Sequence, residues 1–138
     1  MTTIDTAAVP LATGFYTAVS TGDWSLLPAV LHPEVTWIFP GDNVISGTSR
    51  GIDGVIQQAL LIGSYGVEIN FEYVMVGVSS FILKLHNTAR RGSLVLDEHL
   101  GTICTVRDGL IATADTHLSD IEGMNAFFVP LAIPAAAR

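Results

Sequence analysis

The stretch TVRDGLIATADTHLS, residues 105–119, decides the fold class of this chain. Asp108-Gly109 is a strong two-residue hairpin signal, so it predicts that the runs on either side of it pair as antiparallel strands. Three further strand-like runs of apolar and β-branched residues belong to the same region, over residues 67–75, 79–89 and 93–106. Four strands in series predict an antiparallel meander. Residues 67–75 alternate strictly, which predicts one buried and one solvated face.

The N-terminal part of the chain is helical in pattern. Apolar residues at helical spacing predict three helices, over residues 10–21, 24–31 and 52–62. Asp23 is placed to cap the second helix, and a strand is predicted over 34–40. Asp120 is placed to cap a short helix after the last strand. Helices followed by antiparallel strands indicate an α+β fold, in which helices cover the concave face of a curved sheet and leave a pocket.

Length and composition exclude several classes. With 138 residues, the chain predicts a single domain over 1–138, with 131–138 as a tail. The net charge of −7 argues against nucleic acid and anionic membranes as partners. No run approaches the roughly 18 apolar residues that suggest a membrane span, so we expect a cytoplasmic protein. The single cysteine, Cys104, lies in an apolar run and is expected to be a buried core residue rather than a nucleophile.

Several segments together resemble one known family. They are WIFPGDNVISGTSRGIDGV (37–55), LHNTARRGSLVLDEH (85–99), VRDGLI (106–111) and HLSDIEGMNAFF (117–128). Their aromatic, Pro-Gly, loop and helix-start pattern resembles the SnoaL-like polyketide cyclases of the nuclear transport factor 2-like superfamily. The resemblance implies a cone-shaped α+β barrel, commonly a homodimer through the outer sheet face. It also implies one or two ionisable side chains in an apolar cavity, with no organic cofactor.

The last predicted strand carries the leading catalytic candidates. In the cyclases and epoxide hydrolases that the chain resembles, an aspartate on this strand projects into the cavity, and matching on Asp120 places that position at His117. The aromatic residue usual two positions earlier is replaced by Asp115. Residues two apart on a strand share a face, so Asp115 is placed to orient a His117 base. Ile111 shares their spacing and favours burial of this face. If that face is solvated instead, the inward residues are Ala112, Ala114, Thr116 and Leu118.

The preceding strands carry the other candidates. His86 resembles a position that is often histidine in this branch and is a third catalytic candidate, although a structural histidine is an equal alternative. Lys84 shares its face and is expected to be solvated. In LDEHL, either Asp97 and His99 or Glu98 points inward, and Gly101 suggests a bulge that leaves this register open. His99 is a pocket candidate.

The remaining site expectations concern aromatic residues and metals. Phe15, Tyr16, Trp37 and Phe39 are expected to line the pocket, with plain core as the alternative. No HxH or HExxH spacing occurs, and a cluster of the three strand histidines would need three strands to converge, so no metal is predicted.

These expectations give one leading function. It is a cofactor-independent enzyme that acts by acid/base catalysis on an apolar, oxygenated metabolite such as a polyketide or terpenoid, in cyclisation, isomerisation or epoxide opening. The alternatives are a non-catalytic ligand-binding or assembly module, and a scytalone dehydratase-like lyase with two cavity histidines. Fold alone does not choose among them.

Overall fold

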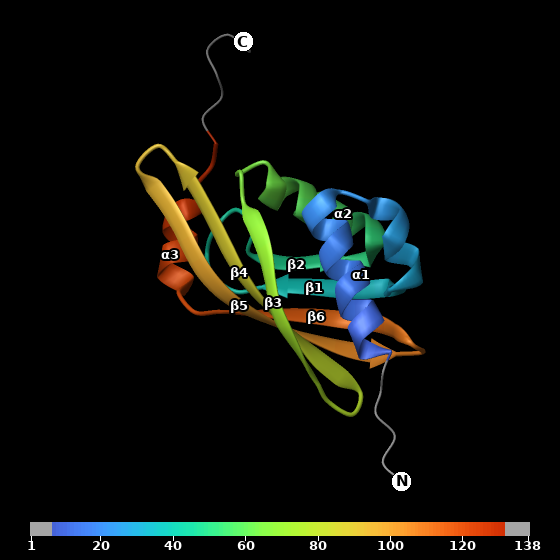
Figure 1. Ribbon diagram of the computed structural model, residues 1–138. Coiled ribbons are helices and arrows are strands. Elements are labelled where there is room, and N and C mark those ends of the chain that lie inside the picture. The colour runs from blue at the N-terminus through green and yellow to red at the C-terminus, as the bar shows by residue number, and fades with distance from the viewer. Residues whose placement is uncertain (1–6, 132–138) are drawn as a thin grey trace.

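A computed structural model describes residues 7–131, so the predicted tail lies, apart from Leu131, outside the described residues. Within these residues, ten elements follow one another (Figure 1). They are α1 (Ala8–Thr21), the 3₁₀ helix η1 (Trp24–Ala29), β1 (Leu31–Phe39), β2 (Gly47–Arg50), α2 (Gly51–Gly63), β3 (Glu68–Val76), β4 (Ser80–Arg91), β5 (Leu94–Arg107), β6 (Leu110–Leu118) and α3 (Ile121–Phe127). None of the helices within residues 7–131 is long and apolar enough to cross a membrane.

The strands form one six-stranded sheet in the order β2-β1-β6-β5-β4-β3. The predicted meander is confirmed, because β3, β4, β5 and β6 pair in succession and antiparallel. Asp108 and Gly109 close the last hairpin with φ of 56° and 77°. Two positive φ angles give a turn whose twist matches that of the flanking strands. β1 pairs parallel with β6 and antiparallel with β2.

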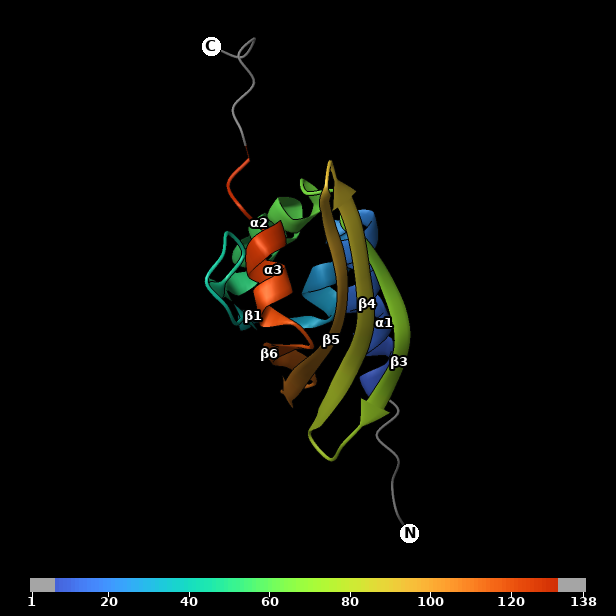
Figure 2. The ribbon, with the colours of Figure 1, turned by 90° about the vertical axis from the view of Figure 1, so that its left-hand side faces the viewer.

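The sheet curves strongly, and its helices lie on the concave side (Figures 1 and 2). The core fills the space between them. Phe15 of α1 packs edge-on against Trp37 of β1, with ring centroids 5.4 Å apart, and Val55 of α2 is fully buried. After β6, Asp120 accepts a hydrogen bond from the Gly123 amide and caps the N-terminus of α3, as predicted. The α+β fold class, with helices packed on a curved and mainly antiparallel sheet, is therefore confirmed.

Three local predictions were wrong. The second helix is a short 3₁₀ helix, since Pro28 inside it has no amide hydrogen to donate. Asp23 does not cap it; the Asp23 carboxylate accepts from the Ser25 hydroxyl instead. The residues of β2 were expected to form a loop, because four polar or glycine residues show no alternation of apolar and polar side chains. They form a strand through their pairing with β1.

The strict alternation predicted for residues 67–75 is also broken. The β3–β4 register shifts between Phe71 and Tyr73, so Phe71 pairs with Leu85 while Tyr73 pairs with Lys84. Phe71, which precedes the shift, contacts Tyr16 of α1 with ring centroids 5.6 Å apart, whereas Tyr73 and Met75, which follow it, are half exposed. A bulge adds one residue to one strand and moves the following side chains to the other face.

Candidate functional site

The face that β6 presents to the interior differs from the predicted one. The β5–β6 pairing is irregular, because Val106 pairs with Ile111 and Thr105 pairs with Thr113, which leaves Ala112 as an extra residue. Ile111 and Ala112 are therefore both buried, and the alternation restarts after them. The prediction that Ile111 shares a buried face with the Asp115 and His117 positions was wrong.

Asp115 and His117 lie on the outer face of the sheet. Their side chains are 50% and 60% exposed, and the His117 Nε2 to Asp115 Oδ2 distance is 3.4 Å. The predicted pairing of the two side chains is present, but it faces solvent rather than the core. A lyase mechanism of the scytalone dehydratase type needs histidines in the cavity, and the position of His117 does not support it.

On the inner face of the sheet, between Asp115 and His117 along β6, uncharged polar groups are hydrogen-bonded to one another. The Trp37 Nε1–H donates to Thr116 Oγ1 at 3.2 Å, and Thr102 Oγ1 lies 3.1 Å from the same oxygen. Phe15, Trp37 and Phe39 are buried in the core, and Tyr16 donates its hydroxyl to the Ile69 carbonyl at 3.1 Å. These hydrogen bonds satisfy polar atoms on the inner side of the sheet and fix the aromatic rings there.

Among the acidic residues that the structure describes, Glu98 is the one whose carboxyl group is buried on the inner face, at 1% exposure. The sequence left the register of this strand open; the β4–β5 ladder is unbroken through Gly101, and the burial pattern of β5 places Glu98 on the inner face. Glu98 Oε1 accepts hydrogen bonds from the Ser119 hydroxyl at 3.1 Å and from the Asp120 amide at 2.8 Å. Glu98 therefore holds the corner between β6 and α3, a role that needs no ligand.

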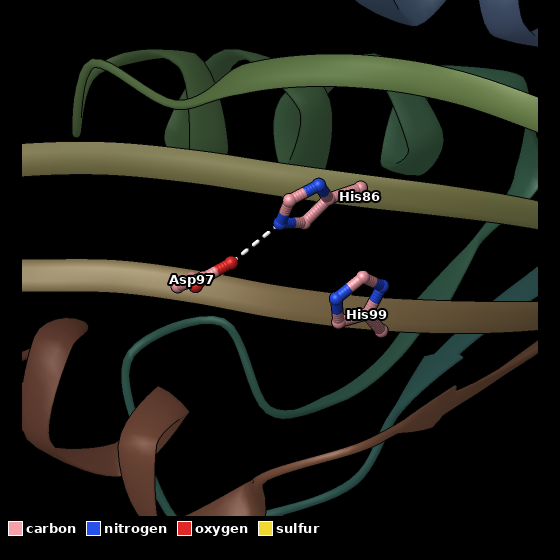
Figure 3. Close-up of side chains that lie close together, drawn as sticks. All are labelled: His86, Asp97 and His99. Atoms are coloured by element: carbon pink, nitrogen blue, oxygen red, sulfur yellow. Dashed lines mark hydrogen bonds and ion pairs between the residues drawn. The ribbon is translucent and has the colours of Figure 1, made fainter.

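Two of the predicted site residues, His86 and His99, meet on the outer face together with Asp97 (Figure 3). His86 pairs directly across the β4–β5 ladder with His99. The two imidazole rings stack, with centroids 4.2 Å apart and planes 8° from parallel. His86 Nε2 is hydrogen-bonded to Asp97 Oδ1. One ligand atom from each of the three residues lies within 4.8 Å of the others, the spacing of a possible metal site.

Charged neighbours surround this cluster. The hydrogen bond from His86 lowers the pKa of the Asp97 carboxyl below its ordinary value of 3.8. Lys84 forms an ion pair with Glu72, and that hydrogen bond lowers the pKa of the Glu72 carboxyl below 4.5. Lys84 Nζ also lies 3.1 Å from His99 Nδ1. Lys84, expected to be solvated, thus joins the ionic network at the rim of the cluster.

An open pocket of about 510 Å³ adjoins the His86–Asp97 pair, at the end of the sheet where the β4–β5 hairpin extends past β3 (Figure 1). Its walls come from β4, β5, the first residue of β3 and the turn that precedes it: Gly66, Glu68, His86, Thr88, Ala89, Arg90, Val95, Leu96 and Asp97. The predicted aromatic residues do not line it. Glycine in the turn, one cation and two carboxylates give the pocket a mixed wall that suits an oxygenated ligand.

Cys104 is the buried core residue that the sequence predicted. Its side chain is inaccessible, and burial raises the pKa of the thiol to about 12. Because the thiolate is the reactive form, this cysteine is not a nucleophile near neutral pH.

Known structures show where this architecture recurs. The chain is similar to an NTF2-like protein from Burkholderia xenovorans, with 21% identity over 88% of this chain and 95% of that one and a TM-score of 0.76. A provisionally named SnoaL-like polyketide cyclase from Jannaschia sp. CCS1 matches at 17% identity over 95% and 98%, with a TM-score of 0.72. TerC, co-crystallised with polyporic acid, matches at 15% identity over 89% and 98%, with a TM-score of 0.76.

No family model and no curated protein matches the sequence. The likeness to these structures establishes the fold: the chain has the NTF2-like architecture, which the SnoaL-like polyketide cyclase shares.

Proposed function

We propose that the protein is a cofactor-independent enzyme that moves a proton on an apolar, oxygenated metabolite bound in the open pocket. The observation that carries this proposal is the His86–Asp97 hydrogen bond on the wall of a pocket of about 510 Å³. The reaction class is cyclisation, isomerisation or epoxide opening, and the substrate class is a polyketide- or terpenoid-like molecule of secondary metabolism. The cytoplasmic location expected from the sequence stays a prediction.

The hydrogen bond assigns roles to the two ring nitrogens. An ionised Asp97 only accepts hydrogen bonds, so His86 Nε2 carries the hydrogen that it donates. The lone pair of the neutral ring is then on Nδ1, which is the atom that takes a proton from the substrate. A carboxylate that fixes the tautomer and stabilises the imidazolium makes such a ring an effective base near neutral pH.

The fold neighbours support the substrate class. TerC shares this architecture and was crystallised with polyporic acid, and the Jannaschia protein is named for polyketide cyclisation. In this chain, Arg90 on the pocket wall supplies a cation that can pair with an acidic oxygen of such a ligand.

A general-base probe tests the proposal without knowledge of the natural substrate. 5-Nitrobenzisoxazole opens when a base removes its ring proton, and the product absorbs in the visible range. Wild-type protein should accelerate the opening, and His86→Gln should lower the rate by about 100-fold, the usual contribution of a positioned base. Asp97→Asn should give a smaller loss. His117→Gln is the matched control, since its ring is on the same sheet face outside the pocket.

Equal rates for wild-type protein and His86→Gln would refute the catalytic assignment. Binding is followed separately by NMR titration with polyporic acid. His86→Gln should retain the chemical-shift changes of residues that line the pocket while losing turnover, because Gln keeps the hydrogen-bonding capacity of the wall.

A second candidate function is a non-catalytic ligand-binding module. It is favoured by the solvent-facing positions of Asp115 and His117 and by the structural use of the inward carboxyl, Glu98. Binding of polyporic acid with no proton transfer above the His86→Gln level would select this function.

We also propose that the protein is a homodimer through the outer sheet face, as the resemblance implied. Five residues, each paired with the next across neighbouring strands, form a row over that face: Met75, Ile82, Ile103, Asp115 and Ile38. Four of the five are apolar, whereas the row at the pocket end is polar, so a second copy can cover the apolar half and leave the pocket open. Light scattering should give twice the chain mass, and Ile103→Asp should give the chain mass. A monomeric wild-type protein would contradict the proposal.

A further inference from the structure

The paired histidines and the aspartate on the outer face have a chemistry beyond proton transfer. We propose that His86, Asp97 and His99 bind one divalent transition-metal ion of the zinc type. The bound ion regulates the proposed activity instead of assisting the reaction, because it occupies His86 Nε2, the ring nitrogen that is otherwise hydrogen-bonded to Asp97. Metal binding itself does not depend on whether the proposed enzyme function is correct.

The backbone places the three side chains on one patch. Asp97 and His99 are two apart on β5, so they share a face, and His86 of β4 lies directly opposite His99. Cross-strand partners have Cβ atoms about 5 Å apart. The β4–β5 ladder is regular from its first pair, Ser80 with Thr105, to its last, Arg91 with Leu94. The ligands therefore project from a rigid pair of strands rather than from loops.

The donor atoms already point toward one side. His86 Nε2 contacts Asp97 Oδ1, and the ring nitrogen of His99 nearest Asp97 faces the same side (Figure 3). One donor from each residue lies within 4.8 Å of the others. Ligands about 2.0–2.2 Å from a tetrahedral ion lie about 3.4 Å apart. To bring the lone pairs together, the parallel rings must turn about their χ2 bonds, and the Asp97 and His99 side chains, 70% and 49% exposed, have solvent beside them in which to do so.

The donor set selects the kind of metal. Two imidazole nitrogens and one carboxylate oxygen suit zinc and its neighbours Co²⁺, Ni²⁺ and Cu²⁺. Magnesium and calcium prefer sites built from oxygen alone. Three protein ligands leave a fourth position for water, which keeps the ion exchangeable.

Lys84 and Glu72 tune the site from the other side of His99. Lys84 Nζ, 3.1 Å from His99 Nδ1, donates to that nitrogen and keeps the hydrogen of the neutral ring on Nε2. A metal at Nε2 requires the hydrogen on Nδ1 instead, and Glu72 Oε1, 3.8 Å from Nδ1, is the acceptor that can hold it there. Lys84 therefore opposes metal binding by its charge and its hydrogen bond, and Glu72 favours it.

Metal binding has a defined effect on the proposed base. When the ion takes His86 Nε2, the ring hydrogen moves to Nδ1, and no lone pair remains there to accept a proton from a substrate. The metal-bound form is then inactive as a general base. Zinc added to the protein is an inhibitor, and chelation by EDTA reverses the inhibition.

Calorimetric titration of tag-free protein with ZnCl₂ tests the site, with Co²⁺ absorption near 600 nm as an independent measure of tetrahedral coordination. Wild-type protein should bind one ion per chain, and MgCl₂ should give no heat. His86→Ala and His99→Ala should each weaken binding by about 100-fold, whereas Lys84→Met should tighten it by about tenfold, the range seen for groups behind metal ligands. Circular dichroism confirms that each variant is folded.

His117→Ala is the matched control, because His117 is an exposed histidine on the same sheet face outside the cluster. It should bind zinc as wild type does. Wild-type affinity no higher than that of His86→Ala would overturn the proposal, and so would equal losses in His117→Ala and His99→Ala. Zinc binding without any base-catalysed activity would support the metal site and refute the proposed enzyme function alone.

Discussion

Replacing Glu98 by alanine is expected to destabilise the corner where β6 ends and α3 begins. One carboxyl oxygen of Glu98 accepts both the Ser119 hydroxyl and the Asp120 amide. Asp120 in turn caps α3 through the Gly123 amide at 2.9 Å. Loss of the carboxyl group therefore releases the residue that starts the C-terminal helix.

The magnitude follows from the groups that lose a partner. Two hydrogen bonds contribute about 1 kcal/mol each, and an amide left without an acceptor adds to that cost. The one methylene group that is removed, Cγ, comes from a side chain that is only 1% exposed and adds about 1 kcal/mol of lost burial. The free energy of unfolding should fall by about 3 kcal/mol. For a chain of this size, the melting temperature should fall by about 10 °C.

Urea denaturation followed by circular dichroism measures the change in unfolding free energy, and calorimetry gives the melting temperature. Glu98→Gln is the matched control, because its amide oxygen can accept the same two hydrogen bonds and its volume is nearly the same. It should stay within about 1 kcal/mol of wild type. Backbone amide exchange should speed up at Asp120 and in α3 in the alanine variant alone.

Two results would refute this reasoning. The first is a Glu98→Ala protein within about 1 kcal/mol of wild type, which would mean that water replaces the carboxyl group at no cost. The second is an equal loss in Glu98→Gln, which would show that the negative charge, and not the acceptor geometry, holds the corner.

Three further predictions concern other groups. Cys104 should not react with Ellman's reagent at pH 8 until urea unfolds the protein, since burial raises the pKa of its thiol to about 12; fast reaction of folded protein would contradict this. The pKa of the Asp97 carboxyl, followed by NMR, should lie below 3.8 in the wild type and return toward 3.8 in His86→Ala. Because this pKa is lowered in the folded state, the ionised carboxylate stabilises the fold above pH 3.8, and the stabilisation is lost as the pH falls through the lowered pKa. Trp37→Phe should cost about 1 kcal/mol in urea denaturation, because Thr116 loses the indole hydrogen bond, and no loss in that variant would show that this bond is not stabilising.

The parts of the fold that local chemistry controls could be predicted from the sequence. The Asp108-Gly109 turn and the Asp120 cap are each settled by a few adjacent residues, and both appear in the structure. The meander followed because strands joined by short turns pair with their neighbours. β2 escaped prediction because its four residues become a strand only through pairing with β1, which the sequence does not reveal.

The candidate site was predicted only in part. His86 was a candidate from the sequence, but its partnership with Asp97 depends on the β4–β5 register, which places Asp97 opposite Thr88 and His99 opposite His86. The alternation Asp97, Glu98, His99 indicated that one of the two sets faces inward, and it could not say which. Burial of Glu98 against Ser119 and Asp120, distant in sequence, decided that question.

By itself, the sequence determined an α+β chain with an antiparallel meander, because turn residues and apolar periods act over short distances. It also determined that Asp115 and His117 share a face, since side chains alternate along a strand. Only the tertiary structure decided which face that is. The extra residue at Ala112 buries Ile111 and turns Asp115 and His117 outward, and such a bulge is defined by pairing with the neighbouring strand, not by the residues of β6 alone.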